Sequence, residues 1–116
     1  MRKYKIEITD EQAHIIKSAC EMYARIGMLQ VDSIIDALPT NKWEEYRDAI
    51  KPFNENNRAT GLYYAKEFHR IAWDLYQVVR HRLAWDEHPE GGIQVYFDEP
   101  HKQAKSEELA KMKEVK

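Results

Sequence analysis

The sequence holds a single cysteine, Cys20, among its 116 residues. A disulfide within the chain is therefore excluded, which is typical of proteins from a reducing compartment. No apolar run approaches the roughly 20 residues that a membrane-spanning helix needs. The segment Met1–Gln12 contains no apolar stretch of the kind found in signal peptides. These absences predict a cytoplasmic protein with no membrane contact.

An excess of basic charge is also missing, since the formal net charge is −2. The chain as a whole therefore lacks the electrostatic footprint of a nucleic-acid-binding protein. It contains no Walker loop, dinucleotide fingerprint, nucleophile elbow or H-E-x-x-H pattern. The spacing of His81 and His88 matches no zinc signature. We accordingly expect no enzyme activity, no metal and no cofactor.

What the sequence does contain is helical periodicity. Thr9 and Gln12 have the spacing of a capping box, and they predict a helix that ends at Gly27. Apolar residues three to four apart predict a short second helix within Met28–Leu38. A third helix is expected to begin after Thr40 or Asn41 and to end at Pro52, with an irregular loop over residues 51–61.

A long amphipathic helix is predicted from Leu62 or Tyr63 to His88, because Pro89 follows. One broad face of this helix is apolar and is expected to pack on the core. Its residues are Tyr64, Ala65, Phe68, Ile71, Ala72, Leu75, Tyr76, Val78, Val79 and Leu83.

Two segments alternate apolar and polar residues, which is typical of half-buried strands. They are Lys3–Thr9 and Ile93–Phe97, the second after a turn at residues 88–92. The predicted fold is mainly α, with three to four helices around one long helix and a small two-stranded antiparallel sheet from the N- and C-terminal strands. Residues 1–100 form one domain, and residues 101–116 are a charged tail or a short C-terminal helix. Exposed aromatics and a strand edge favour a homo-oligomer.

The candidate site is centred on Trp73, which lies on the polar side of the long helix. A planar ring beside arginine and histidine suits a nucleotide, because the ring stacks on a base and arginine binds phosphate. The alternative is a tryptophan in a helix–helix or subunit interface. The predicted ligand-binding residues are Trp73, Arg80, His69, Gln77, Arg70, His81 and Arg82.

Arg82 is a charge within the apolar face of the long helix, so it needs a partner. We expect a structural ion pair with Asp98, and Asp86 and Glu99 are alternative partners. A further alternative is an anion pocket, with Arg82 at its floor and backbone N–H groups from residues 91–92 at its wall.

The stretch 71–100, IAWDLYQVVRHRLAWDEHPEGGIQVYFDEP, resembles the C-terminal block of an uncharacterised family of small proteins encoded by phages and prophages of Gram-positive bacteria. The earlier pattern ITDEQ followed by EMYARIGM resembles the same group. The resemblance implies a phage origin and expression inside a bacterial host cell, and it implies no reaction. It covers Trp73, Arg80, His81, Arg82, Trp85, Gly91, Gly92 and Asp98.

The expected function is therefore that of a non-enzymatic phage or prophage accessory protein. It is expected to bind a small anionic ligand, most simply a nucleotide immune signal that it sequesters against host defence. This expectation depends on analogy with a class of small phage proteins. The alternative is a protein–protein interaction module that binds and inhibits a host or phage protein.

Overall fold

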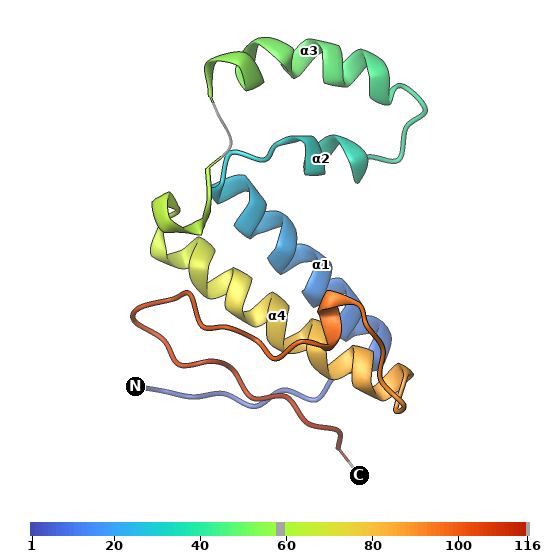
Figure 1. Cartoon of the computed structure of the whole chain (residues 1–116), viewed down its shortest axis with the longest axis vertical. Coiled ribbons are helices and arrows are strands. Elements are labelled where there is room, and N and C mark those ends of the chain that lie inside the picture. The colour runs from blue at the N-terminus through green and yellow to red at the C-terminus, as the bar shows by residue number, and fades with distance from the viewer. Residues whose placement is uncertain (58–59, 116) are drawn as a thin grey trace.

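A computed structural model describes residues 1–57 and 60–115. Four α-helices lie in this part of the chain, together with two short 3-10 helices (Figure 1). The α-helices are α1 (Asp10–Gly27), α2 (Asp32–Asp36), α3 (Trp43–Asn56) and α4 (Glu67–Glu87), and the 3-10 helices are η1 (Leu62–Tyr64) and η2 (Val95–Phe97). The predicted loop over residues 51–61 is helical as far as Asn56, and residues 58–59 lie outside the described part.

Helices α1 and α4 lie side by side and run in opposite directions (Figure 1). At one end His14 Nε2 lies 2.7 Å from Glu87 Oε1, and at the other the rings of Tyr23 and His69 are 4.6 Å apart. The core between them is a cluster formed by Ala13, Val79 and Leu83, against which Ile8, Ile16, Leu75 and Met112 pack. The prediction that Val79 and Leu83 face the core is confirmed.

The predicted capping box at the start of α1 is confirmed. The Thr9 hydroxyl accepts from the Gln12 N–H at 3.2 Å, and the Gln12 side chain accepts from the Thr9 N–H at 2.9 Å. The helix ends at Gly27, as predicted, and there it approaches α4 closely. A Cβ added to Gly27 would lie 2.2 Å from Cγ of His69, so only glycine fits this crossing.

Helices α2 and α3 form an arm that extends from the end of α1 (Figure 1). Helix α3 packs against α2, and none of its residues is buried. The prediction that Pro52 ends this helix is wrong, because Pro52 lies inside it. Its surface is exposed, so water can satisfy the carbonyl group that the missing N–H leaves unpaired.

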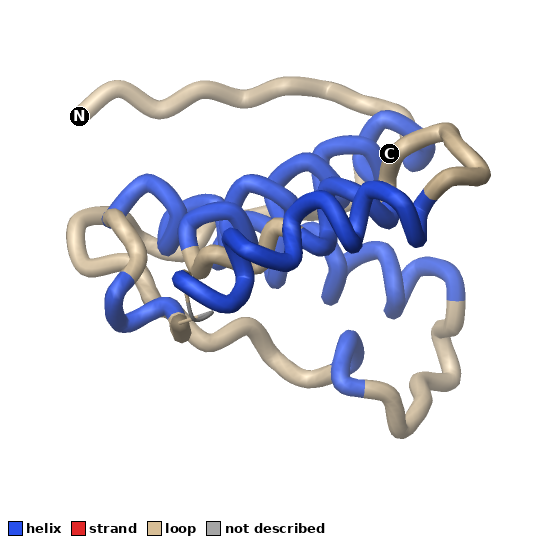
Figure 2. Tube along the Cα trace, turned by 90° about the horizontal axis from the view of Figure 1, so that it is seen from above, coloured by secondary structure: helices blue, strands red, loops and turns tan. Residues whose placement is uncertain are grey.

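The predicted two-stranded sheet is wrong, because the structure assigns no strand over residues 1–57 and 60–115 (Figure 2). Residues 1–8 are extended but have no strand beside them. Residues 95–97 form the 3-10 helix η2, since the Phe97 ring packs edge-to-face on Trp85 at 5.2 Å and draws the chain back onto α4. Packing of one aromatic ring thus overrides a local alternation that fits a strand.

The long helix begins at Glu67, later than predicted. Residues 62–64 form η1, and the extended backbone of Ala65 (ψ 157°) separates η1 from α4. Tyr64 and Phe68 were predicted to face the core, and this is wrong because both are exposed. None of the helices in the described chain has the length and apolar character needed to cross a membrane.

Residues 101–115 contain no helix. Figure 1 shows this segment running along α4 toward the start of that helix and then returning toward the N-terminal segment. We call residues 101–106 the strap, because their backbone is held against α4 by side chains of that helix. Ala104 of the strap is buried, and Met112 further along packs on the core cluster.

Candidate functional site

The seven predicted ligand-binding residues all lie on α4, yet they contact different neighbours. His69 and Trp73 face α1, and Arg80 lies on the ring of Tyr76. Gln77 faces the strap, Arg70 reaches back to η1, and Arg82 lies along α4 itself. His81 is half-buried. The structure therefore brings only part of the predicted set together.

Trp73 lies at the contact between α4 and α1. The guanidinium of Arg25 sits 5.8 Å from the centre of its ring, in cation–π geometry. The ring of Tyr76 is 5.0 Å away and tilted against it. Arg25 also donates to Glu21 at 3.0 Å and to Gln30 at 2.7 Å, so this guanidinium is already well bonded.

Arg80 completes this group, which we call the Trp73 cluster: Glu21, Arg25, Trp73, Tyr76 and Arg80. The Arg80 Nη1 donates to the Tyr76 hydroxyl at 3.2 Å, and its guanidinium lies 4.9 Å from the ring centre. Burial raises the pKa of Tyr76, and the charge of Arg80 opposes that effect. Arg80 Nε is buried and has no hydrogen-bond partner among the described residues. The Trp73 cluster thus contains one acidic side chain, that of Glu21, together with two guanidinium groups and two aromatic rings.

His69 is used in helix packing. Its ring contacts Tyr23 and fills the space above Gly27. Its Nδ1 is buried with no partner in the part of the chain that is described. This position suits a spacer between helices.

Arg70 fixes the turn that precedes α4. Its Nε donates to the carbonyl of Leu62 at 2.9 Å, and its Nη2 donates to the carbonyl of Tyr63. It also lies 3.7 Å from Glu67. These bonds hold the 3-10 helix η1 in place, so they set the positions of the two tyrosines that follow each other in it.

The strap is held by three side chains of α4 that form a ladder. Gln77 donates to the carbonyl of His101 at 2.8 Å and accepts from its N–H at 3.0 Å. Asp74 accepts from the N–H groups of Gln103 and Ala104 at 2.8 and 2.9 Å. Glu67 accepts from the N–H groups of Lys105 and Ser106.

These strap bonds explain the unusual acidity of Glu67. Hydrogen bonds from Ser106 and Lys105 lower the pKa of this carboxyl group to about 2. Asp74 is only 3% exposed, and two charge-assisted bonds satisfy its carboxylate. Sequence reasoning found Gln77 but gave it a different role, and it missed Asp74 and Glu67. A signal was available, since residues 67, 74 and 77 share one stripe of the helix.

Arg82 forms its ion pair with Asp86, one turn further along α4, and hydrogen bonding with that carboxylate raises the pKa of Arg82. The predicted pair with Asp98 does not occur among the described residues, because Asp86 lies on the same helix and is always within reach. The turn after α4 is held by packing. Gly91 has φ 79°, and a Cβ there would lie 2.9 Å from the Trp85 ring.

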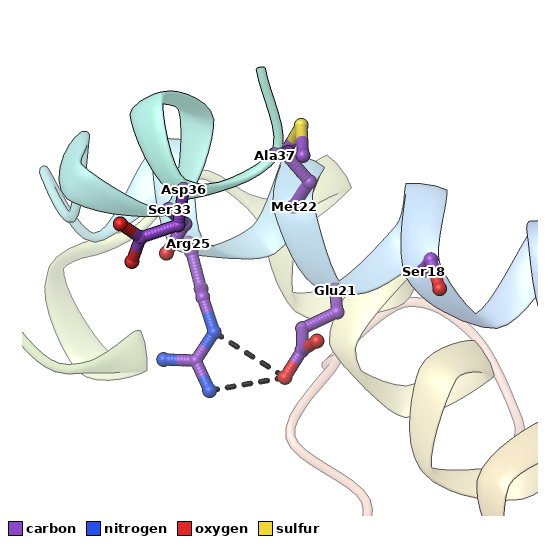
Figure 3. A pocket seen from close by; sticks show the side chains of 7 residues that line it. All are labelled: Ser18, Glu21, Met22, Arg25, Ser33, Asp36 and Ala37. Carbon is purple, nitrogen blue, oxygen red and sulfur yellow. Dashed lines mark hydrogen bonds and ion pairs between the residues drawn. The ribbon is translucent and has the colours of Figure 1, made fainter. Parts of the chain in front are cut away.

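Two open cavities are lined by none of the seven predicted residues, although the first borders the Trp73 cluster through Glu21 and Arg25. The first, about 350 Å³, lies between α1 and α2 and contains the paired Glu21 and Arg25 side chains (Figure 3). The second, about 390 Å³, lies between α2 and the end of α3. Within the described chain, no group of three or more His, Cys, Asp or Glu residues could hold a metal ion. Burial raises the pKa of Cys20, the chain's one thiol.

Exposed aromatic side chains gather at the start of α4. Tyr63, Tyr64 and Phe68 are 79%, 77% and 74% exposed. The two tyrosine rings pack edge-to-face at 5.1 Å. We call these three residues the aromatic patch. Its rim carries the exposed Lys66. Most exposed apolar residues need no explanation, but three exposed aromatic residues within six positions of the chain indicate an interaction surface.

Comparison with known proteins adds no relative: no family model, no curated protein and no solved structure matches the chain.

Proposed function

We propose that this protein is a non-enzymatic protein-binding module that captures its partner on the aromatic patch. The observation that carries the proposal is the exposure of three aromatic side chains within six positions of the chain, each more than 70% accessible to water. Tyrosine and other aromatic residues are enriched among the residues that dominate binding energies at protein interfaces.

The patch is built on a fixed backbone. Arg70 binds the carbonyls of Leu62 and Tyr63, so the backbone that carries Tyr63 and Tyr64 is held in place before a partner arrives. A preformed surface loses less conformational entropy on binding than a flexible loop does. The arrangement supports recognition, because an exposed apolar surface without a partner only lowers solubility.

The side chains of the patch indicate what kind of surface its partner presents. Three rings with an adjacent lysine fit a protein that offers an apolar groove with acidic residues at its rim. The resemblance to small phage proteins suggests a partner from the bacterial host or from the phage itself. Binding would then inhibit or redirect that partner.

The experiment compares three forms of the protein as immobilised baits in a host lysate. They are the wild type, the double variant Tyr64→Ser/Phe68→Ser, and the control Ile93→Ser, which removes a fully exposed apolar side chain elsewhere. We expect the wild type and the control to recover the same partner protein from the lysate. The double variant should recover at least tenfold less of it. The purified partner should repeat this order in calorimetry. Equal recovery by all three baits would contradict the proposal.

A second candidate function is binding of a small anionic ligand, such as a nucleotide, at the Trp73 cluster. The specific observation in its favour is a pair of guanidinium groups beside the Trp73 and Tyr76 rings, with Arg80 Nε unbonded among the described residues. Thermal-shift measurements with cyclic dinucleotides and ADP-ribose derivatives test it. We expect a rise in Tm for the wild type and none for Arg80→Gln. A wild type that no nucleotide stabilises excludes this candidate.

A further inference from the structure

The N-terminal segment has the sequence of a strand but no strand beside it. Residues 3–8 alternate, with Tyr4, Ile6 and Ile8 on one side and Lys3, Lys5 and Glu7 on the other. Tyr4 is 84% exposed and Ile6 is 78% exposed. Figure 2 shows the segment as an extended loop along the outside of the helices.

Its backbone is free to pair. Within the described chain, no hydrogen bond joins the N–H and C=O groups of residues 1–8 to another group; the first bonded residue is Thr9. The nearby C-terminal segment contributes one exposed ion pair, Lys3 with Glu108 at 3.9 Å. A single exposed ion pair stabilises little. An extended segment with β-branched alternation and unpaired backbone groups is a template for another strand.

We propose that two copies of this protein form a homodimer in which residues 3–9 of each copy pair as antiparallel strands about a twofold axis at Ile6. The occupant of the free edge is thus a second copy of the same segment. This pairing joins two molecules, and it differs from the pairing with residues 93–97 that the structure excludes. It is also separate from the aromatic patch and does not depend on the proposed function.

The register follows from complementarity of charge and shape. With Ile6 opposite Ile6 of the partner copy, Lys5 lies opposite Glu7 twice, once on each side of the axis. On the other face Tyr4 lies opposite Ile8 of the partner copy, also twice. Opposite charges and aromatic–β-branched pairs are both favourable across strands. A register shifted to Lys5 would set two lysines against each other at the axis.

The pairing also continues the core of each molecule. Ile8 already packs on the cluster of Ala13, Val79 and Leu83. In the dimer, Tyr4 of the partner copy would lie beside Ile8 and cover the edge of that cluster. A two-stranded ribbon alone is only marginally stable, so this contact with a packed core is what the ribbon needs. The twofold axis closes the assembly at two copies.

The test uses untagged full-length protein in sedimentation equilibrium and native mass spectrometry. Lys5 and Glu7 are exposed and form no ion pair among the described residues, so their variants should fold normally, which circular dichroism checks. Lys5→Glu alone and Glu7→Lys alone each turn two attractive pairs into two repulsive ones. We expect each to raise the dimer Kd about tenfold or more.

Two further samples decide the register. The double variant Lys5→Glu/Glu7→Lys restores opposite charges and should dimerise as the wild type does. An equimolar mixture of the two single variants should form the mixed dimer, because one chain then carries two acidic groups opposite two lysines. The control Ile93→Lys adds a charge at another exposed isoleucine and should leave the dimer unchanged.

Three outcomes overturn the proposal. They are a wild type that stays monomeric at concentrations of hundreds of micromolar, single variants that dimerise as tightly as the wild type, and a mixture that forms no mixed dimer. Hydrogen exchange gives an independent measure, since alternate amides within residues 4–8 should be slowed, and only where the dimer is populated.

Discussion

Helices α1 and α4 and helices α2 and α3 are both pairs of neighbouring helices, but they differ in how much they bury. The first pair encloses the cluster of Ala13, Val79 and Leu83 and carries the strap along its flank. In the second pair, α3 has no buried residue over its whole length. Its contacts with α2 include surface polar pairs such as Arg47 with Asp36.

This difference indicates that the α1–α4 pair contributes most of the stability of the fold. Stability is unevenly distributed in proteins, and segments with few buried apolar contacts open at low cost. The α1–α4 pair therefore acts as the scaffold on which the aromatic patch is held. The α2–α3 arm is an attachment whose local opening should leave that scaffold folded. Each prediction below compares a change in one region with a matched change elsewhere.

The largest difference should come from truncating a core side chain. Leu83 is buried in the cluster, so Leu83→Ala removes packing and leaves a cavity, which should lower the free energy of unfolding by about 3 kcal/mol. Phe53→Ala on α3 removes a larger side chain, yet it should cost less than about 1 kcal/mol because that ring is partly exposed. Urea denaturation followed by circular dichroism measures both. Equal losses would mean that the arm is as tightly packed as the scaffold.

The strap provides the next largest effect. Asp74→Ala leaves two backbone N–H groups, those of Gln103 and Ala104, without their buried acceptor, and we expect a loss of about 2 to 3 kcal/mol. The matched control is Asp48→Ala on exposed α3, which should change stability by less than about 0.5 kcal/mol. Hydrogen exchange should also quicken at residues 103 and 104. If the two variants are equally stable, the strap does not contribute to the fold.

A smaller effect should distinguish the close crossing of α1 and α4 from an open glycine position. Alanine in a helix is favoured over glycine by about 1 kcal/mol, so Gly27→Ala would stabilise a loosely packed helix. The new methyl group would collide with His69, and we expect a net loss of about 1 to 2 kcal/mol. Gly61→Ala meets no neighbour within 4 Å and should be neutral or slightly stabilising. Thermal unfolding of the wild type and the two variants measures these changes. A Gly27→Ala variant more stable than the wild type would contradict the tight crossing.

Local features of the fold could be predicted from the sequence. The capping box of Thr9 with Gln12, the end of α1 at Gly27 and the core positions Val79 and Leu83 all depend on neighbours within a few residues. Features that depend on distant partners could not. The strap meets α4 across 24 to 39 residues of sequence, and nothing in the segment 101–106 indicates which side chains will receive its N–H groups.

The candidate site shows the same limit. The helical wheel places His69, Trp73 and Arg80 on one side of α4, and the structure agrees that His69 and Trp73 share a side, which faces α1. A wheel cannot tell whether a polar side faces water or a neighbouring helix. Tyr64 and Phe68 show the reverse: their apolar character predicted burial, but both are exposed. In both cases, the exposure of a side chain depends on whether a distant element packs against it.

The smallest effect is expected from protonation of Glu67 at low pH. It tests only the outer end of the strap, at residues 105 and 106. The pKa of Glu67 in the folded protein is about 2, against an ordinary value of 4.5. Because the folded-state pKa is depressed, the carboxylate stabilises the strap fully above pH 4.5. That contribution falls as the pH drops toward 2, where protonation removes the negative charge of the carboxylate and weakens its bonds from the amides of Lys105 and Ser106.

Amide chemical shifts at residues 105 and 106 should therefore titrate with a midpoint near pH 2. Glu67→Gln, which cannot titrate, should remove the transition and serves as the control. Its effect on global stability should be small, because the side chain is about one-third exposed. A midpoint near the ordinary value of 4.5 would show that the end of the strap is detached in solution. The strap would then be held through Asp74 and Gln77 only, and its outer end would resemble the α2–α3 arm more than the scaffold.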